Sequence, residues 1–197
     1  MPALLALALL LAVAVPVPPR PSATAVRRAR EGAERALVEV HGRRAAGAGV
    51  LVGARGEVLT ALRFIDTQGN NVRLGSTVLG TRLVMASPTL RVAVLNMVGP
   101  GPYPAMPVQL EAPVAGAWVV CIVLLADGGA EPHLGRLLRV PGEGTLWLEV
   151  SLRLPPGSLV LDESGRLLGV VVEARRHDSL AAPLSAVRAE LESAAAR

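Results

Sequence analysis

The stretch GAGVLVGARGEVLTALRFID, residues 47–66, decides the fold. It holds two short runs of mainly apolar and β-branched residues, 48–52 and 57–60, each preceded by glycine, and such runs bounded by Gly, Pro, Asn or Asp are typical of β-strands. Similar runs recur along the chain, and we predict strands at 37–41, 48–52, 57–60, 71–74, 77–85, 91–98, 117–124, 134–140, 145–150, 159–162 and 166–173. Many short strands with frequent turn signals indicate an all-β barrel or sandwich rather than alternating βαβ units.

Helices and turns are predicted outside these strands. Residues 24–36 carry apolar side chains at helical spacing and predict a short amphipathic helix. A terminal helix is expected from Pro183 to Ala196, with the proline near its start. The residues DESG at 162–165 predict a hairpin turn. The Pro/Gly-rich segment 99–104 predicts a crossing between two six-stranded halves.

Composition indicates a packed globular chain with one sizeable core, because 51% of its 197 residues are hydrophobic and 18% are charged. All 20 basic residues are arginines, scattered among 16 carboxylates, and aromatics make up only 2%, which argues against nucleic-acid binding. No Cys/His cluster has zinc spacing and no glycine-rich loop of phosphate-binding type is present, so no metal or cofactor is expected. The single cysteine, Cys121, is expected to be a core residue.

The N-terminus resembles a secretory signal. Residues 3–15 are an unbroken apolar run, shorter than the roughly 20 residues of a membrane-spanning helix and suited to a signal peptide. Ala23-Thr24-Ala25 is a candidate cleavage site, and Ala12-Val13-Ala14 is a second. We expect residues 1–25 to be removed and residues 26–197 to be exported to the periplasm or the extracellular space. The alternative is an N-terminal membrane anchor.

Residues 47–66 resemble the first catalytic segment of HtrA/Deg-type trypsin-like serine proteases. In that family a G-x-G-hydrophobic strand and a G-x-hydrophobic-L-T strand precede an H-V-V turn, whose histidine is the general base. Arg63 stands at the position of that histidine. A guanidinium stays protonated at working pH and cannot accept a proton from a serine. In the family motif D-x-x-x-D-L-A-V-L the second aspartate orients the histidine, and the similar segment Ser87–Leu95 has Arg91 there.

Further matches occur in the family's order over nearly the whole mature chain. The family's V-G-x-x-V-x-x-I-G strand is similar to Val114–Val123, its T-x-G-x-V-S element to His133–Leu138, and its hydrophobic-A-I-P motif to Leu180–Leu184. The resemblance implies a trypsin-like double six-stranded β-barrel with a short N-terminal helix and a C-terminal helix. It also implies one peptidase-like domain, for which we expect no PDZ module.

The nucleophile segment departs from the family pattern P-G-N-S-G-G-P-L. Aligned without a gap, Pro155 stands at the serine; with two glycines deleted, Ser158 stands there. The family's oxyanion hole uses the backbone N–H groups of the serine and of the residue two before it. Either register places a proline, Pro155 or Pro156, at a donor position, and proline has no N–H. The resemblance therefore implies that no catalytic residue is intact at the vestigial triad positions Arg63, Arg91 and Pro155 or Ser158.

The two arginines should project toward the vestigial site between the barrels. Because an unpaired buried charge costs several kcal/mol, we expect each to be solvated or paired with a carboxylate, with Asp66 as the nearest candidate for Arg63. A relocated triad would need His41, His133 or the pair His177-Asp178 to converge with a serine. Nothing in the sequence brings them together.

Three functions remain open from the sequence. The first is a catalytically inactive homologue, a pseudoprotease, that binds extended peptides or a protein partner in the groove between the barrels. The second is an active serine endopeptidase with a non-standard site that uses Ser158. The third is an unrelated exported β-sandwich of structural or adhesive type.

Overall fold

The computed structural model describes residues 19–111, 113–139, 144–175 and 178–195. The strands in these ranges are β1 (Leu37–His41), β2 (Ala46–Leu51), β3 (Glu57–Ala61), β4 (Asn71–Leu74), β5 (Thr77–Ser87), β6 (Val92–Met97), β7 (Trp118–Leu124), β8 (Ala130–Arg139), β9 (Leu146–Val150), β10 (Leu159–Leu161), β11 (Leu167–Ala174) and β12 (Ser179–Pro183). The helices are α1 (Ala23–Ala36), the short 3-10 helix η1 (Leu62–Phe64) and α2 (Leu184–Ala195).

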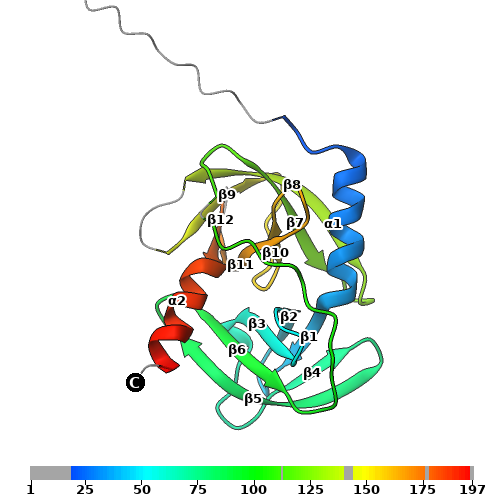
Figure 1. Cartoon of the computed structure of the whole chain (residues 1–197), viewed down its shortest axis with the longest axis vertical. Coiled ribbons are helices and arrows are strands. Elements are labelled where there is room, and N and C mark those ends of the chain that lie inside the picture. The colour runs from blue at the N-terminus through cyan, green and yellow to red at the C-terminus, as the bar shows by residue number, and fades with distance from the viewer. Residues whose placement is uncertain (1–18, 112, 140–143, 176–177, 196–197) are drawn as a thin grey trace, which may run out of the picture.

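The strands close into two six-stranded antiparallel barrels (Figure 1). The first has the order β1-β2-β3-β6-β5-β4, and the second has the order β10-β11-β12-β9-β8-β7. The predicted double barrel is therefore confirmed. The alternative of a β-sandwich is wrong, because each sheet closes on itself instead of facing the other as an open layer.

Two strands differ most from the sequence prediction, and the others shift by at most two residues at an end. β12 was absent from the predicted strands, because its sequence SLAAP has no β-branched residue; its pairing with β11 and β9 holds it in the sheet. β8 begins at Ala130, four residues before the predicted start at 134, because Ala130 pairs with Leu124 of β7. His133 consequently lies inside a strand and not at its start.

The helices α1 and α2 lie on opposite sides of the molecule (Figure 1). α1 packs along β7 and β8 of the second barrel and reaches β2 of the first. It begins where the Ala25 N–H donates to Ser22 Oγ at 3.2 Å, an N-cap interaction. α2 packs on β11 and β12, and its Glu190 accepts a 2.7 Å hydrogen bond from Ser87 Oγ of β5. α2 thus joins the second barrel to the first.

The apolar core is continuous across the two barrels. Side chains of the second barrel, among them Ile122 and Leu159, pack in the same buried cluster as Val50 and Leu59 of the first barrel. A separate cluster that includes Cys121 fills the interior of the second barrel. Cys121 is fully buried, as predicted, and burial raises the pKa of its thiol to about 12. In the described part of the chain, no helix has the length and apolar character needed to cross a membrane.

The long connection between β6 and β7 carries the predicted crossing. It runs from the first barrel up to the second in Figure 1. Met106 N–H donates to Leu51 O at 2.8 Å in the first barrel, and Gln109 N–H donates to Leu167 O at 2.9 Å in the second. The connection is therefore hydrogen-bonded to both barrels.

Candidate functional site at the barrel interface

Arg63 lies in η1, directly after β3. The Leu62 N–H donates to Arg91 O at 2.8 Å, which places the two predicted site residues on adjacent backbone segments. The neighbouring Phe64 is buried, and a Cβ on Gly47 would stand 2.2 Å from its ring. The first glycine of the G-x-G motif therefore makes room for Phe64, which anchors η1. The Arg63 side chain is exposed, and its guanidinium carbon lies 5.9 Å from the Phe64 ring centroid.

Arg91 precedes β6 and has a backbone φ of 57°, which is uncommon for a residue other than glycine. Its guanidinium forms an ion pair with Glu173 of β11 in the second barrel. The other carboxylate oxygen of Glu173 accepts a 2.9 Å hydrogen bond from Arg175. The hydrogen bonds from Arg175 and from Arg91 hold the pKa of Glu173 below its ordinary value. Arg91 is thus paired with a carboxylate, as expected.

Residues 155–158 form a type II β-turn. Ser158 N–H donates to Pro155 O at 3.1 Å, Pro156 takes the second position, and Gly157 takes the third with a φ of 89°. This is the arrangement that a Pro-Gly pair favours. The Ser158 hydroxyl donates to the same Pro155 carbonyl at 2.7 Å, and the residue is only 1% exposed. The turn therefore uses both the backbone and the side chain of Ser158.

The backbone N–H groups of this turn are all accounted for. Pro155 and Pro156 have none, Ser158 N–H is bonded within the turn, and Gly157 N–H donates to Val171 O at 2.7 Å. Gly157 also lies against the first barrel, where a Cβ would stand 2.5 Å from Ala48 O. Residues 155–158 thus offer no free backbone N–H to a ligand oxygen.

A cleft of about 460 Å³ separates η1 from this turn. One wall comes from the first barrel and includes Glu39 and Arg63, and the other comes from the second barrel and includes Leu125, Pro155 and Ser158. The structure therefore brings Arg63 together with both candidate nucleophile positions. Arg91 does not line the cleft, since its side chain extends to Glu173 instead.

The prediction that Asp66 is the partner of Arg63 is wrong. Among the described residues Asp66 forms no ion pair with Arg63; its carboxylate accepts the backbone N–H of Gln68 at 3.1 Å. The exposed Arg63 is instead solvated, which was the other outcome considered. No carboxylate of the described residues forms an ion pair with the Arg63 guanidinium, although Glu39 lines the same cleft.

The sequence did not predict Glu39, which lines the cleft, or Glu173, which pairs with Arg91 outside it. Burial pushes the pKa of Glu39 up, but the hydrogen bond from Arg73 and the neighbouring His41 and Arg73 charges outweigh it, and the pKa is lowered. The Glu39–Arg73 pair follows from the β1–β4 register, which sets the two residues opposite each other. A correct strand pairing would have found it. Arg91 and Glu173 are 82 residues apart, and no local sequence signal links them.

The histidines do not join Ser158 in the part of the chain that the structure describes. His41 Nε2 lies 3.1 Å from Glu39, and His133 Nε2 lies 3.6 Å from Glu131. His177 falls outside the described residues. Within those residues, no group of three or more His, Cys, Asp and Glu side chains is arranged to hold a metal ion.

Comparison with known proteins gives relatives at the level of structure. No protein-family model matches the sequence, and no curated protein matches it. The serine endoprotease of Yersinia pestis matches with a TM-score of 0.75 and 21% identity, over 90% of this chain and 67% of its own. Rv3671c of M. tuberculosis matches in two inactive forms. The form with a serine-to-alanine mutation has a TM-score of 0.73 and 18% identity, over 92% of this chain and 98% of its own.

The second inactive form of Rv3671c gives a TM-score of 0.72 and 19% identity, over 91% of this chain and 98% of its own. Sequence identities this low, together with the structural match, support a shared fold but are not evidence of a shared activity. The two closed barrels and the two α-helices of this chain fit the fold that the structural match to these proteases indicates. The chain has the double-barrel fold of the trypsin-like serine proteases.

Proposed function

We propose that this protein is a non-hydrolytic homologue of the trypsin-like serine proteases, which binds an extended peptide or a protein segment in the cleft between its barrels. The observation that carries the proposal is the hydrogen bond from Ser158 Oγ to Pro155 O at 2.7 Å. A nucleophilic serine needs a base that takes its proton. Here the hydroxyl proton is directed at a carbonyl oxygen of the turn itself.

Two further features support the absence of hydrolysis. Arg63, on the opposite wall of the cleft, carries a permanent positive charge and cannot act as a base. The turn at 155–158 has no free N–H to stabilise a tetrahedral oxyanion, and loss of one such donor lowers kcat by about 10²–10³-fold in a working protease. These deficits act on different parts of the mechanism, so repairing one leaves the others.

The cleft retains features that suit a peptide. Its walls combine apolar side chains such as Leu125 and Pro156 with the charged side chains of Glu39 and Arg63. β11 also extends beyond β10: the β10–β11 ladder ends at Leu159 opposite Val170, and the turn at 155–158 adds main-chain hydrogen bonds only as far as Val171. The part of β11 beyond this pairing is a place where an extended chain could add main-chain hydrogen bonds. Binding of this kind needs no catalytic triad.

A fluorophosphonate probe tests the absence of hydrolysis. We expect no stoichiometric labelling of the purified protein and no cleavage of a mixed peptide library, while trypsin treated in parallel reacts fully. Labelling at Ser158 together with hydrolysis that Ser158→Ala abolishes would establish the alternative, an active endopeptidase with a non-standard site.

Peptide binding is tested separately with the same library, by fluorescence anisotropy. Ala126 is exposed on the second-barrel wall of the cleft, so Ala126→Trp fills the cleft without disturbing the core. We expect this variant to lose binding. Ala54→Trp, at an exposed position on the turn between β2 and β3, serves as a control of equal bulk. Equal binding by wild type and Ala126→Trp would contradict the proposed site.

A further inference from the structure

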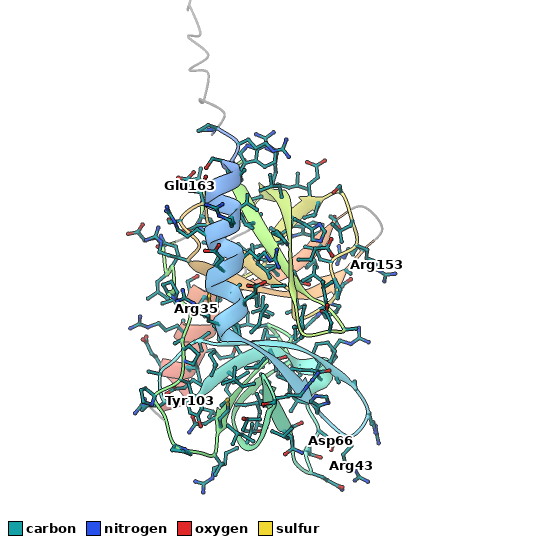
Figure 2. All side chains as sticks on the ribbon, turned by 90° about the vertical axis from the view of Figure 1, so that its right-hand side faces the viewer. Arg35, Arg43, Asp66, Tyr103, Arg153 and Glu163 are labelled. Carbon is teal, nitrogen blue, oxygen red and sulfur yellow. The ribbon has the colours of Figure 1, made fainter. Side chains whose placement is uncertain are left out.

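A pocket of about 560 Å³ lies beside the cleft on the first barrel. It is formed by the loop between β1 and β2 and by the segment from η1 to residue 68. We call it the basic pocket, because the charged side chains on its wall are Arg43, Arg44, Arg63 and Asp66. Figure 2 shows Arg43 and Asp66 together at this end of the first barrel.

The positive charge of the basic pocket is not balanced. Three guanidiniums against one carboxylate leave two positive charges in excess. Arg43 donates to the neutral amide oxygen of Gln68, and Asp66 is occupied by the Gln68 backbone N–H. Within the described residues, neither Arg44 nor Arg63 forms an ion pair. Each of the three guanidiniums therefore keeps hydrogen-bond donors for an anionic partner.

Several arginines elsewhere in the described chain are paired with acidic groups. Carboxylates accept from arginines of both barrels and of α2, for example Arg55, Arg73, Arg91, Arg166 and Arg188. The scattered arginines of the sequence therefore do not make a uniformly basic surface. Three arginines without a carboxylate partner among the described residues, Arg43, Arg44 and Arg63, gather where the basic pocket meets the cleft.

The basic pocket and the cleft are continuous. Arg63 and Phe64 line both, so a chain that occupies the cleft passes Arg63 at the boundary. On the cleft side the carboxylate of Glu39 is already held by Arg73 and His41. It does not neutralise Arg63. A ligand extending from the cleft into the basic pocket therefore meets positive charge along its way.

We propose that the basic pocket recognises acidic side chains of a peptide bound in the cleft, so that the partner of this protein is an acidic extended segment. This inference rests on the proposed function. Guanidiniums bind carboxylates through paired N–H donors. Nucleic acid fits less well, because recognition of single strands uses exposed aromatic rings, and the aromatic ring of the pocket, Phe64, is only 8% exposed.

The test compares three labelled peptides that differ at two adjacent central residues, which are glutamates, glutamines or arginines. We expect the glutamate peptide to bind about tenfold more tightly than the glutamine peptide at about 0.05 M salt, since exposed ion pairs contribute modestly. The arginine peptide should bind most weakly. Raising the salt to about 0.5 M should remove most of the preference by screening.

A matched pair of triple variants locates the preference. The combination Arg43→Gln, Arg44→Gln and Arg63→Gln should bind the glutamate and glutamine peptides equally. The control combination Arg28→Gln, Arg35→Gln and Arg82→Gln removes the same charge from exposed arginines outside the basic pocket and the cleft, and it should keep the preference. Thermal melting of both variants confirms that they fold.

Each outcome separates the inference from the proposed function. If the glutamate and glutamine peptides bind wild type equally and Ala126→Trp abolishes both, the cleft binds peptides but the basic pocket does not select acidic ones. An equal loss in both triple variants would assign the preference to net charge and overturn the inference. Tighter binding of a single-stranded oligonucleotide than of the glutamate peptide would also overturn it. If no peptide binds, both proposals fail.

Discussion

The guanidinium of Arg91 and the carboxylate of Glu173 form an ion pair that joins the first barrel to the second. Arg91 stands between β5 and β6, and Glu173 stands on β11, where it also accepts from Arg175. The guanidinium of Arg175 in turn lies 4.9 Å from the ring centroid of Trp147 on β9. A charge network thus spans the two barrels beside the candidate site.

The first prediction concerns the strength of this link. The side chains of Arg91 and Glu173 are 56% and 33% exposed, so a double-mutant cycle with Arg91→Ala and Glu173→Ala should give a coupling free energy of about 0.2–1 kcal/mol. Urea unfolding at low salt measures it, and high salt should reduce it. A coupling of zero at low salt would mean that the pair adds nothing to stability.

The second prediction concerns pH. The pKa of Glu173 is lowered from its ordinary value of 4.5 by the hydrogen bonds from Arg175 and Arg91. The unfolded chain therefore takes up this proton at a higher pH than the folded chain does. The stability that Glu173 contributes is present above pH 4.5 and is lost as the pH falls through the folded-state value. Urea midpoints measured across this range should fall less in Glu173→Gln than in wild type.

The third prediction concerns the turn at 155–158. Gly157→Ala combines a φ of 89° with a Cβ 2.5 Å from Ala48 O, so we expect a loss of about 3 kcal/mol or more in the free energy of unfolding. Gly75→Ala is a matched control, because Gly75 has a φ of 57° but an open surrounding. Its loss should be roughly 1–2 kcal/mol. Equal losses would mean that the contact with Ala48 is relaxed without effect.

The fourth prediction concerns restoration of family residues. The double variant Arg63→His with Arg91→Asp should show no peptide hydrolysis, because the turn at 155–158 still lacks oxyanion donors. It should also be less stable than wild type, since Arg91→Asp replaces the ion pair with a carboxylate facing Glu173. Hydrolysis assays and urea unfolding check the two parts. Activity in this double variant would show that the turn is not the limiting defect.

The fifth prediction concerns export. We propose that the leader is removed and that intact mass of exported protein will correspond to a chain beginning near Val26. Cleavage after Ala25 would remove Ser22, the N-cap of α1, and the first turn of that helix. The buried Ala29, Ala33 and Ala36 would remain to hold the shortened helix on the barrel. Recovery of the full-length chain in the cytosol would contradict export.

Much of the fold could be predicted from short-range patterns. Short apolar and β-branched runs bounded by Gly, Pro, Asn or Asp located eleven strands, because the strand preference and the turn signals of these runs are local properties of the sequence. β12 was not predicted, because alanine, leucine and serine have little preference for strands. Its segment SLAAP is a strand because it pairs with β11 and β9. The sequence therefore predicts strands best where the local signal and the tertiary pairing agree.

The positions of the candidate site residues were easier to predict from the sequence than the ion pairs and hydrogen bonds of their side chains. Arg63, Pro155 and Ser158 line one cleft, as their motif positions imply. Their partners depend on distant segments: Arg91 finds Glu173 across the barrels, whereas Asp66, close to Arg63 in sequence, turns to Gln68. Nearness along the chain is a poor guide to ion pairing where a 3-10 helix and a loop set the direction of each side chain.

The turn at 155–158 limits which single substitutions this chain can accept during evolution. Its geometry uses Pro156 and Gly157 at the two central positions, and the Pro155 carbonyl accepts both the N–H and the hydroxyl of Ser158. Replacing one proline supplies a single N–H but leaves the hydroxyl bonded and Arg63 in place. Replacing Gly157 introduces a clash with Ala48. Replacement of either central residue therefore lowers the stability of the turn without completing an oxyanion hole, so a change of this turn toward the family's loop would pass through less stable chains.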